Sequence, residues 1–135
     1  MRRLLVSLAL VATTFGCTSD SPVTPPISEI VGSYGLASVN GSALPFTYAV
    51  SGADKAEVLD DVITLTADGR WTEVWHDRYT MNGVVTTEEM SDEGAYSRVG
   101  NRITLTSSFG GAIVADVANG KITMSGNGFS LIYSR

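Results

Sequence analysis

The residues with the clearest potential for chemistry lie between positions 70 and 80. Three aromatic residues recur there every four positions, with two carboxylates between them: Trp71, Glu73, Trp75, Asp77 and Tyr79. Because side chains alternate between the two faces of a β-strand, all five would share one face. Such a face could bind an apolar or ring-bearing ligand, and its carboxylates could orient the ligand or hold a cation. The alternative is that the face of Val74 points inward and that the aromatic side chains lie outside or under a loop.

His76 is the only histidine, and it lies on the opposite face of the same segment. A metal site or a nucleophilic mechanism would need partners for it. The chain contains no second histidine and no cysteine other than Cys17. Carboxylates alone remain possible partners for a hard cation. We interpret His76 as a solvated side chain.

Four acidic residues gather around a turn expected near position 91: Glu88, Glu89, Asp92 and Glu93. They match no EF-hand spacing, and the chain has no Gly-x-Ser-x-Gly nucleophile motif. Paired acids could hydrolyse glycosides, which requires a cleft and a carboxylate separation that a sequence does not show. A charged edge that discourages aggregation is the favoured interpretation. We therefore expect no enzymatic activity, no metal and no cofactor.

The N-terminus has the pattern of a lipoprotein signal. Two arginines precede an apolar run over residues 4–15, which is too short to span a bilayer, and Gly16 precedes the only cysteine, Cys17. Residues 13–17 resemble a lipobox, with Thr14 where leucine is usual. We expect residues 1–16 to be a signal peptide that is cleaved before Cys17. Lipid on Cys17 would then make the membrane a partner of the protein.

Residues 17–31 are expected to form a tether. Three prolines lie among serines and threonines between positions 18 and 26, a composition that favours an extended, solvated spacer. The expected location is the cell envelope, with the domain outside the cytoplasm. No aspartate directly follows Cys17, so the outer membrane is favoured if the source has two membranes.

The rest of the chain, residues 32–135, is expected to be one acidic domain. The mature chain expected after cleavage lacks Arg2 and Arg3, so it keeps seven basic residues against fourteen acidic ones, a net charge of −7. This balance argues against nucleic acid as a partner. Short runs of β-forming residues alternate with turns that contain glycine, asparagine or aspartate. The strands predicted from this pattern cover residues 32–39, 46–50, 62–66, 70–80, 84–90, 94–99, 102–106, 112–117, 121–125 and 129–134.

Residues 53–59 are the least strand-like part and are expected to form a short helical turn or a loop. About eight to ten strands joined by tight turns predict an all-β fold, a small antiparallel up-and-down barrel, because closure removes exposed edges. A barrel of this size is either filled by its own side chains or holds one small ligand. The large residues that could fill it are Tyr34, Leu36, Ile63, Leu65, Ile103, Leu105, Leu131 and Tyr133.

The segment Gly32-Ser33-Tyr34-Gly35-Leu36-Ala37-Ser38-Val39-Asn40-Gly41 resembles the opening strand of lipocalin-like domains in bacterial lipoproteins, with Tyr34 in place of tryptophan. The stretches 68–71, 94–96 and 103–105 are also similar to this group. The resemblance implies a barrel over residues 32–135, in which Arg135 covers the ring of Tyr34, and an apolar ligand. The candidate ligand-binding residues are then Trp71, Glu73, Trp75 and Tyr79, together with Tyr34 and Tyr96. The same opening also resembles small META-type heat-shock lipoproteins, which is the weaker match.

The sequence is compatible with two functions. The first is a non-enzymatic binding module, a tethered barrel that takes up a small hydrophobic molecule. The second is a structural or protein-interaction module of the envelope whose barrel is filled by its own side chains. The interior volume discriminates between them. An apolar cavity of about 300 Å³ or more favours a ligand, and a filled core with an exposed aromatic patch favours a protein partner.

Overall fold

The computed structural model describes residues 29–135. The expected signal peptide, Cys17 and most of the expected tether lie outside these residues. The described chain is all-β, as predicted, and its strands are β1 (Gly32–Val39), β2 (Phe46–Ser51), β3 (Asp54–Leu65), β4 (Arg70–Met81), β5 (Val84–Val99), β6 (Arg102–Ser107), β7 (Ala112–Ala118), β8 (Lys121–Gly126) and β9 (Phe129–Ser134).

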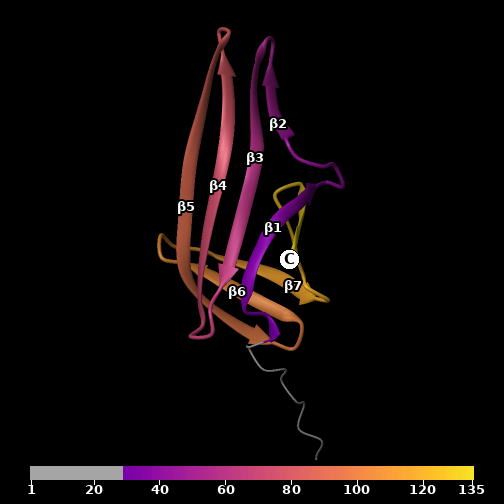
Figure 1. Cartoon of the computed structure of the whole chain (residues 1–135), viewed down its shortest axis with the longest axis vertical. Helices are drawn as coiled ribbons and strands as arrows, with labels where there is room; N and C mark the ends of the chain where they lie inside the picture. Colours follow the sequence, from indigo (N-terminus) through magenta and orange to yellow (C-terminus); the bar gives the residue numbers. More distant parts are fainter. Residues whose placement is uncertain (1–28) are drawn as a thin grey trace, which may run out of the picture.

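Eight of these strands close into an antiparallel barrel, which confirms the predicted fold class (Figure 1). Each strand from β3 to β9 pairs with the next one along the chain. β1 closes the ring, because it pairs with β9 on one side and with β3 on the other. β2 is the ninth strand and lies outside the ring, where it pairs with the first half of β3.

Three barrel strands continue well beyond the ring. β3 and β4 contain 12 residues each and β5 contains 16, whereas β1 and β6 to β9 contain six to eight. β5 pairs with β6 only from Gly94 onward, so its first half extends with β4 and β3 away from the ring. β2 completes a four-stranded projecting sheet, made of β2 and of residues 54–60, 76–81 and 84–90 (Figure 1). This sheet rises on one side of the barrel mouth.

Two segments differ from the sequence-based expectation. Residues 53–59, expected to be a helical turn or a loop, belong almost entirely to β3. Residues 84–90 and 94–99, expected to be two strands, form the single strand β5. The acidic residues from Glu88 to Glu93 consequently lie along a strand and not around a turn. In both cases pairing with the full length of β4 imposes an extended backbone on a polar segment.

A β-bulge in β3 controls which side chains face the interior. The register with β4 shifts between Val58 and Asp60, so that Val58 lies opposite Asp77 and Asp61 lies opposite Trp75. Val58 and Asp61 therefore share a face although three positions separate them. Asp61 then continues the inward alternation to Ile63, which is fully buried.

Side chains fill most of the barrel interior. Of the eight large residues expected to point inward, seven are buried and Leu131 is partly buried against them. Trp71 and Tyr96 add to this core from β4 and β5. The indole of Trp71 donates a hydrogen bond to the Thr106 carbonyl oxygen at 3.2 Å. At Gly94 a Cβ atom would lie 1.8 Å from that same oxygen, so the close approach of β5 to β6 requires glycine.

The base of the barrel, at the end away from the projecting sheet, is closed by the two ends of the described chain. The Arg135 guanidinium lies 4.7 Å from the centre of the Tyr34 ring and donates to the Glu29 carbonyl oxygen at 2.9 Å. It also donates to the Tyr34 hydroxyl. That hydroxyl in turn donates to the Ile30 carbonyl oxygen at 2.7 Å. Ile30, expected in the tether, is only 4% exposed, so the packed domain begins before Gly32.

Candidate functional site

A pocket of about 390 Å³ opens at the mouth of the barrel, where the projecting sheet rises. Its lining comes from the mouth ends of β1, β7, β8 and β9 and from the inner face of β2, β3 and β4. The pocket lies above the filled part of the core, beyond Leu36 and Met124. Its volume falls within the range of small-molecule sites, which starts near 300 Å³.

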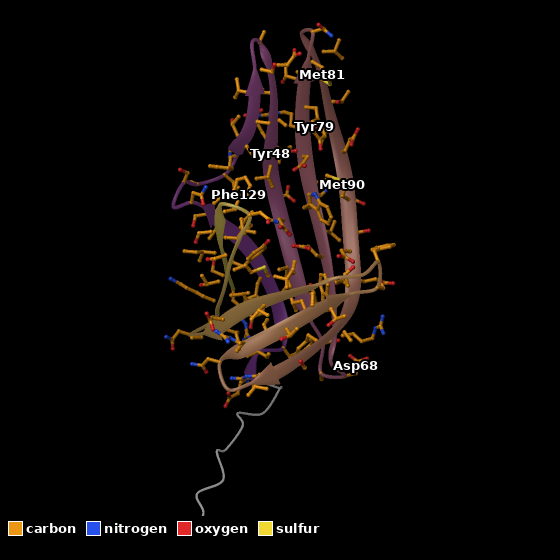
Figure 2. All side chains as sticks on the ribbon, turned by 180° about the vertical axis from the view of Figure 1, so that it is seen from behind. Tyr48, Asp68, Tyr79, Met81, Met90 and Phe129 are labelled. Carbon is orange, nitrogen blue, oxygen red and sulfur yellow. The ribbon has the colours of Figure 1, made fainter. Side chains whose placement is uncertain are left out.

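Aromatic and aliphatic side chains make up most of the wall. Trp75 and Val58 line the pocket from the sheet side, and Ile113 lines it from β7. Phe46 and Phe129 meet edge to face at the rim, with ring centroids 6.3 Å apart and an angle of 88° between their planes. Figure 2 shows Phe129 at the mouth of the barrel, below the projecting sheet. The rim is thus held together by an aromatic contact between β2 and β9.

Asp61 is a buried carboxylate in this mostly apolar wall. It is 8% exposed, and it lines the pocket. The Tyr133 hydroxyl donates to Asp61 Oδ2 at 2.6 Å and lies 3.3 Å from Glu73 Oε1, so it links the two carboxyl groups. Asp61 Oδ1 is buried and has no hydrogen-bond partner. The carboxyl group of Asp61 also interacts with that of Glu73.

Burial changes the protonation of this carboxyl pair. Loss of solvation raises the pKa of Asp61 to about 6. Loss of solvation and the neighbouring Asp61 charge raise the pKa of Glu73 to about 8. Burial beside both carboxyl groups also raises the pKa of Tyr133, which keeps its proton as a donor. Near neutral pH the pair therefore holds one proton and carries about one negative charge.

Asp77 is a second buried carboxylate on the pocket, two positions beyond Trp75 on the same face of β4. The Tyr48 hydroxyl donates to Asp77 Oδ2 at 2.8 Å, and the Tyr79 hydroxyl donates to the same oxygen at 3.2 Å. Burial and these polar neighbours raise the pKa of Tyr48, so its hydroxyl remains a donor. Tyr48 belongs to β2, and its bond to Asp77 therefore joins the ninth strand to the barrel wall.

The outer face of the same strands carries a separate set of ion pairs. His76 Nδ1 lies 2.7 Å from Asp60 Oδ1, and His76 Nε2 lies 3.1 Å from Glu89 Oε2. The hydrogen bond with Asp60, together with that of Glu89, raises the pKa of His76. His76 thus lies outside the barrel, as expected, but between two carboxylates and not free in solvent.

Glu57 forms the second outer cluster. Its carboxylate lies 2.8 Å from Arg78 Nε and 3.0 Å from Lys55 Nζ. The hydrogen bonds from Arg78 and Lys55 lower the pKa of Glu57 to about 2. Both clusters face away from the pocket, because Glu57 and Asp60 alternate with the inward residues Val58 and Asp61.

The predicted binding face of β4 points inward, but its residues divide between three places. Trp75 and Asp77 line the pocket. Glu73 lies behind Asp61, and Tyr79 contributes its hydroxyl to Asp77. Trp71 is 1% exposed and packs into the filled core.

The two candidate residues outside β4 also lie away from the pocket. Tyr34 is fully buried at the base beneath Arg135. Tyr96 is 6% exposed and donates to the Thr66 carbonyl oxygen at 2.7 Å. Neither side chain lines the mouth, so both act in packing the opposite end of the barrel.

Sequence reasoning missed Asp61, Tyr133 and Tyr48 as site residues. The alternation that identified Ile63 and Leu65 as inward continues back to Asp61, and this signal could have found it. Tyr133 was expected only as a core residue. Tyr48 has no comparable signal, because the bulge in β2 between Thr47 and Ala49 determines its direction.

The arrangement can bind and orient a small molecule. Its apolar wall provides contact area, and two buried carboxylates at separate points could accept hydrogen bonds. Within residues 29–135, no group of three or more metal-ligating side chains is arranged to hold a metal ion. The same residues contain no helix that is long and apolar enough to span a bilayer.

Comparison of the chain with protein-family models, with curated proteins and with solved structures found no match.

Proposed function

We propose that this protein is a lipid-anchored binding module of the cell envelope, which takes up a small apolar molecule at the mouth of its barrel without catalysing a reaction. The observation that carries the proposal is the pocket itself. Its volume of about 390 Å³ suits a small molecule, its wall is mainly apolar, and a few polar groups converge on it.

The barrel supports this function in a further way. Its base is closed by packed side chains, and its mouth is open beside the projecting sheet. A small barrel that is filled at one end and open at the other can hold one ligand without losing its core. Lipocalin-like ancestry is proposed on the same grounds, together with the resemblance of the opening strand at residues 32–41.

The location is proposed from the N-terminal sequence. Two arginines, a short apolar run and Gly16-Cys17 support export and lipidation of Cys17. The acyl chains would attach the domain to a membrane outside the cytoplasm, and the outer membrane is preferred where there are two.

A second candidate function is an interaction module of the envelope. The observation that favours it is a set of exposed apolar side chains near the tips of the projecting sheet: Val50, Met81, Val84 and Val85. Figure 2 shows Met81 at the end of this sheet, far from the mouth of the barrel. Met81 and Val84 lie opposite each other in the pairing of β4 with β5, and exposed apolar residues that adjoin in this way are typical of protein contacts.

The two candidates are separated by measuring ligand binding directly. Mass spectrometry of the purified full-length chain should detect a co-purified small molecule, and the neutral dye Nile red should bind with quenching or enhancement of tryptophan fluorescence. The chain has two tryptophans, of which Trp75 lines the pocket and Trp71 is buried in the core. Trp75→Phe should therefore abolish most of the dye-dependent change. A protein that carries no molecule and binds no dye would refute ligand uptake and favour the interaction module.

A further inference from the structure

The pocket has a marked asymmetry of charge. Two of its lining residues are the buried acids Asp61 and Asp77, and Glu73 lies directly behind Asp61. None of the residues that line it is a lysine, an arginine or a histidine. The cationic groups of β3 and β4 near the pocket are bound to carboxylates on the outer face. They are Lys55, His76 and Arg78.

Asp61 is the strongest indication of what the pocket recognises. Its side chain is more than nine-tenths buried, and its Oδ1 atom has no hydrogen-bond partner. A buried carboxylate oxygen without a full complement of donors is costly, since its desolvation is not compensated. A ligand that brings an N–H donor, above all a charged one, would provide the missing interaction.

The aromatic residues around these acids suit the same ligand chemistry. Trp75 lies between Asp61 and Asp77 on the inner face, because it pairs with Asp61 across the strands and precedes Asp77 by two positions. Phe46, Tyr48 and Phe129 complete the aromatic part of the wall. Aromatic faces attract cations as well as apolar groups, and the attraction is strongest where water is excluded.

We propose that the pocket selects a molecule with an apolar body and a positively charged amine, and that Asp61 and Asp77 receive the amine. This inference rests on the proposed ligand-binding function and names the chemical class of the ligand. It also implies that anionic molecules such as fatty acids are disfavoured, because no cation in the pocket would pair with their carboxylate.

The test compares three molecules that share one alkyl chain and differ in charge: decylamine, decanol and decanoate. Each is used to displace Nile red from the purified full-length chain at neutral pH. We expect decylamine to displace the dye at a concentration at least about tenfold lower than decanoate, with decanol between them. The reason is that the amine gains a favourable contact with the carboxylates, whereas decanoate has no cation to pair with. This comparison needs no variant and does not depend on the folding of one.

Single substitutions then show which carboxylates cause the preference for decylamine. Asp61→Asn and Asp77→Asn keep the side-chain shape and should each reduce the preference for decylamine over decanol. Asp60→Asn is the matched control, because Asp60 is the neighbouring residue on the outer face and contacts His76. It should leave the preference unchanged. Circular dichroism and thermal unfolding establish that each variant is folded before its binding is measured.

The outcomes distinguish a failure of the predicted amine preference from a failure of the proposed ligand-binding function. If Nile red binds and the three molecules displace it equally, or decanoate displaces it best, the pocket binds ligands but the preference for amines is wrong. The same conclusion follows if the preference persists in the double variant Asp61→Asn/Asp77→Asn. If neither the dye nor any of the three molecules binds, both the inference and the proposed function are refuted.

Discussion

The carboxyl pair beneath the pocket makes a definite prediction for stability. Glu73 has an ordinary pKa of 4.5 in the unfolded chain, and burial beside Asp61 raises it to about 8 in the folded protein. Below pH 4.5 both states hold the proton. Between pH 4.5 and 8 the unfolded chain loses the proton while the folded protein keeps it, so the free energy of unfolding falls as the pH rises. Above about pH 8 the loss is complete.

The size of this loss follows from the shift. One pKa unit corresponds to about 1.4 kcal/mol, so the rise of between three and four units corresponds to about 5 kcal/mol. The shift of Asp61 is not added, because the two groups share one proton and titrate together. The other charges that act on the pair are Asp60 on β3, Asp77 on β4 and Asp92 on β5.

Glu73→Gln removes the titration and keeps the shape of the side chain, and its amide can still donate to Asp61. We expect wild type and variant to have similar unfolding free energies near pH 4. Relative to wild type, the variant should become more stable as the pH rises, by up to about 5 kcal/mol at pH 9. Urea denaturation followed by tryptophan fluorescence at a series of pH values measures the difference.

The control is Glu93→Gln, the same chemical change at an exposed position on β5. The pH dependence of the wild type should persist in this variant, because Glu73 is still present. The raised pKa of His76 adds a pH dependence of its own, but His76 is present in all these proteins and cancels from the comparison. A difference between wild type and Glu73→Gln that does not change with pH would refute the reasoning.

Three further predictions concern other parts of the chain. Gly94→Ala places a carbon atom 1.8 Å from the Thr106 carbonyl oxygen, and urea unfolding should show a loss of about 3 kcal/mol or more, whereas an unchanged midpoint would contradict the close approach. Arg135→Ala removes the cation over the Tyr34 ring, and thermal unfolding should show a loss of about 1–2 kcal/mol, with Arg135→Lys in between. Cys17→Ser should move the protein out of the membrane fraction after cell lysis, and persistence there would contradict lipid anchoring at this residue.

Much of the fold could be predicted from the sequence because each turn is determined by a few residues that are adjacent in the chain. Asn82 and Gly83 both have the positive φ values expected of an Asn-Gly hairpin, 51° and 78°. The alternation in residues 62–66 identified Ile63 and Leu65 as inward, and both are buried. Signals of this kind depend on a few neighbouring residues, so they are readable without knowledge of the partner strand.

The long strands were harder to predict because their cause is not local. In β3 the bulge between Val58 and Asp60 interrupts the alternation, and a pattern of period two no longer fits the segment. In β5 the run from Ser91 to Glu93 has the composition of a turn, yet each of its residues pairs with β4. Tertiary pairing outweighs local preference in both segments.

The dependence on pairing with other strands also explains why only part of the candidate site could be predicted. The face of β4 that carries Trp75 and Asp77 could be predicted, since one strand is enough to define it. The carboxylate that completes the site, Asp61, lies on another strand, and only the register of β3 against β4 brings it opposite Trp75. Tyr48, one of the two tyrosines that donate to Asp77, comes from β2, and no local pattern indicates that β2 lies outside the ring.

The closed base of the barrel has a consequence for how the molecule can be mounted. Glu29 and Arg135, the two ends of the described chain, are joined there by a hydrogen bond, and the pocket opens at the other end. A sensor chip, a bead or a vesicle coupled to either end of the described chain would therefore hold the protein by the closed base of the barrel. The occupant of the pocket would then exchange with the surrounding medium and not with the supporting surface.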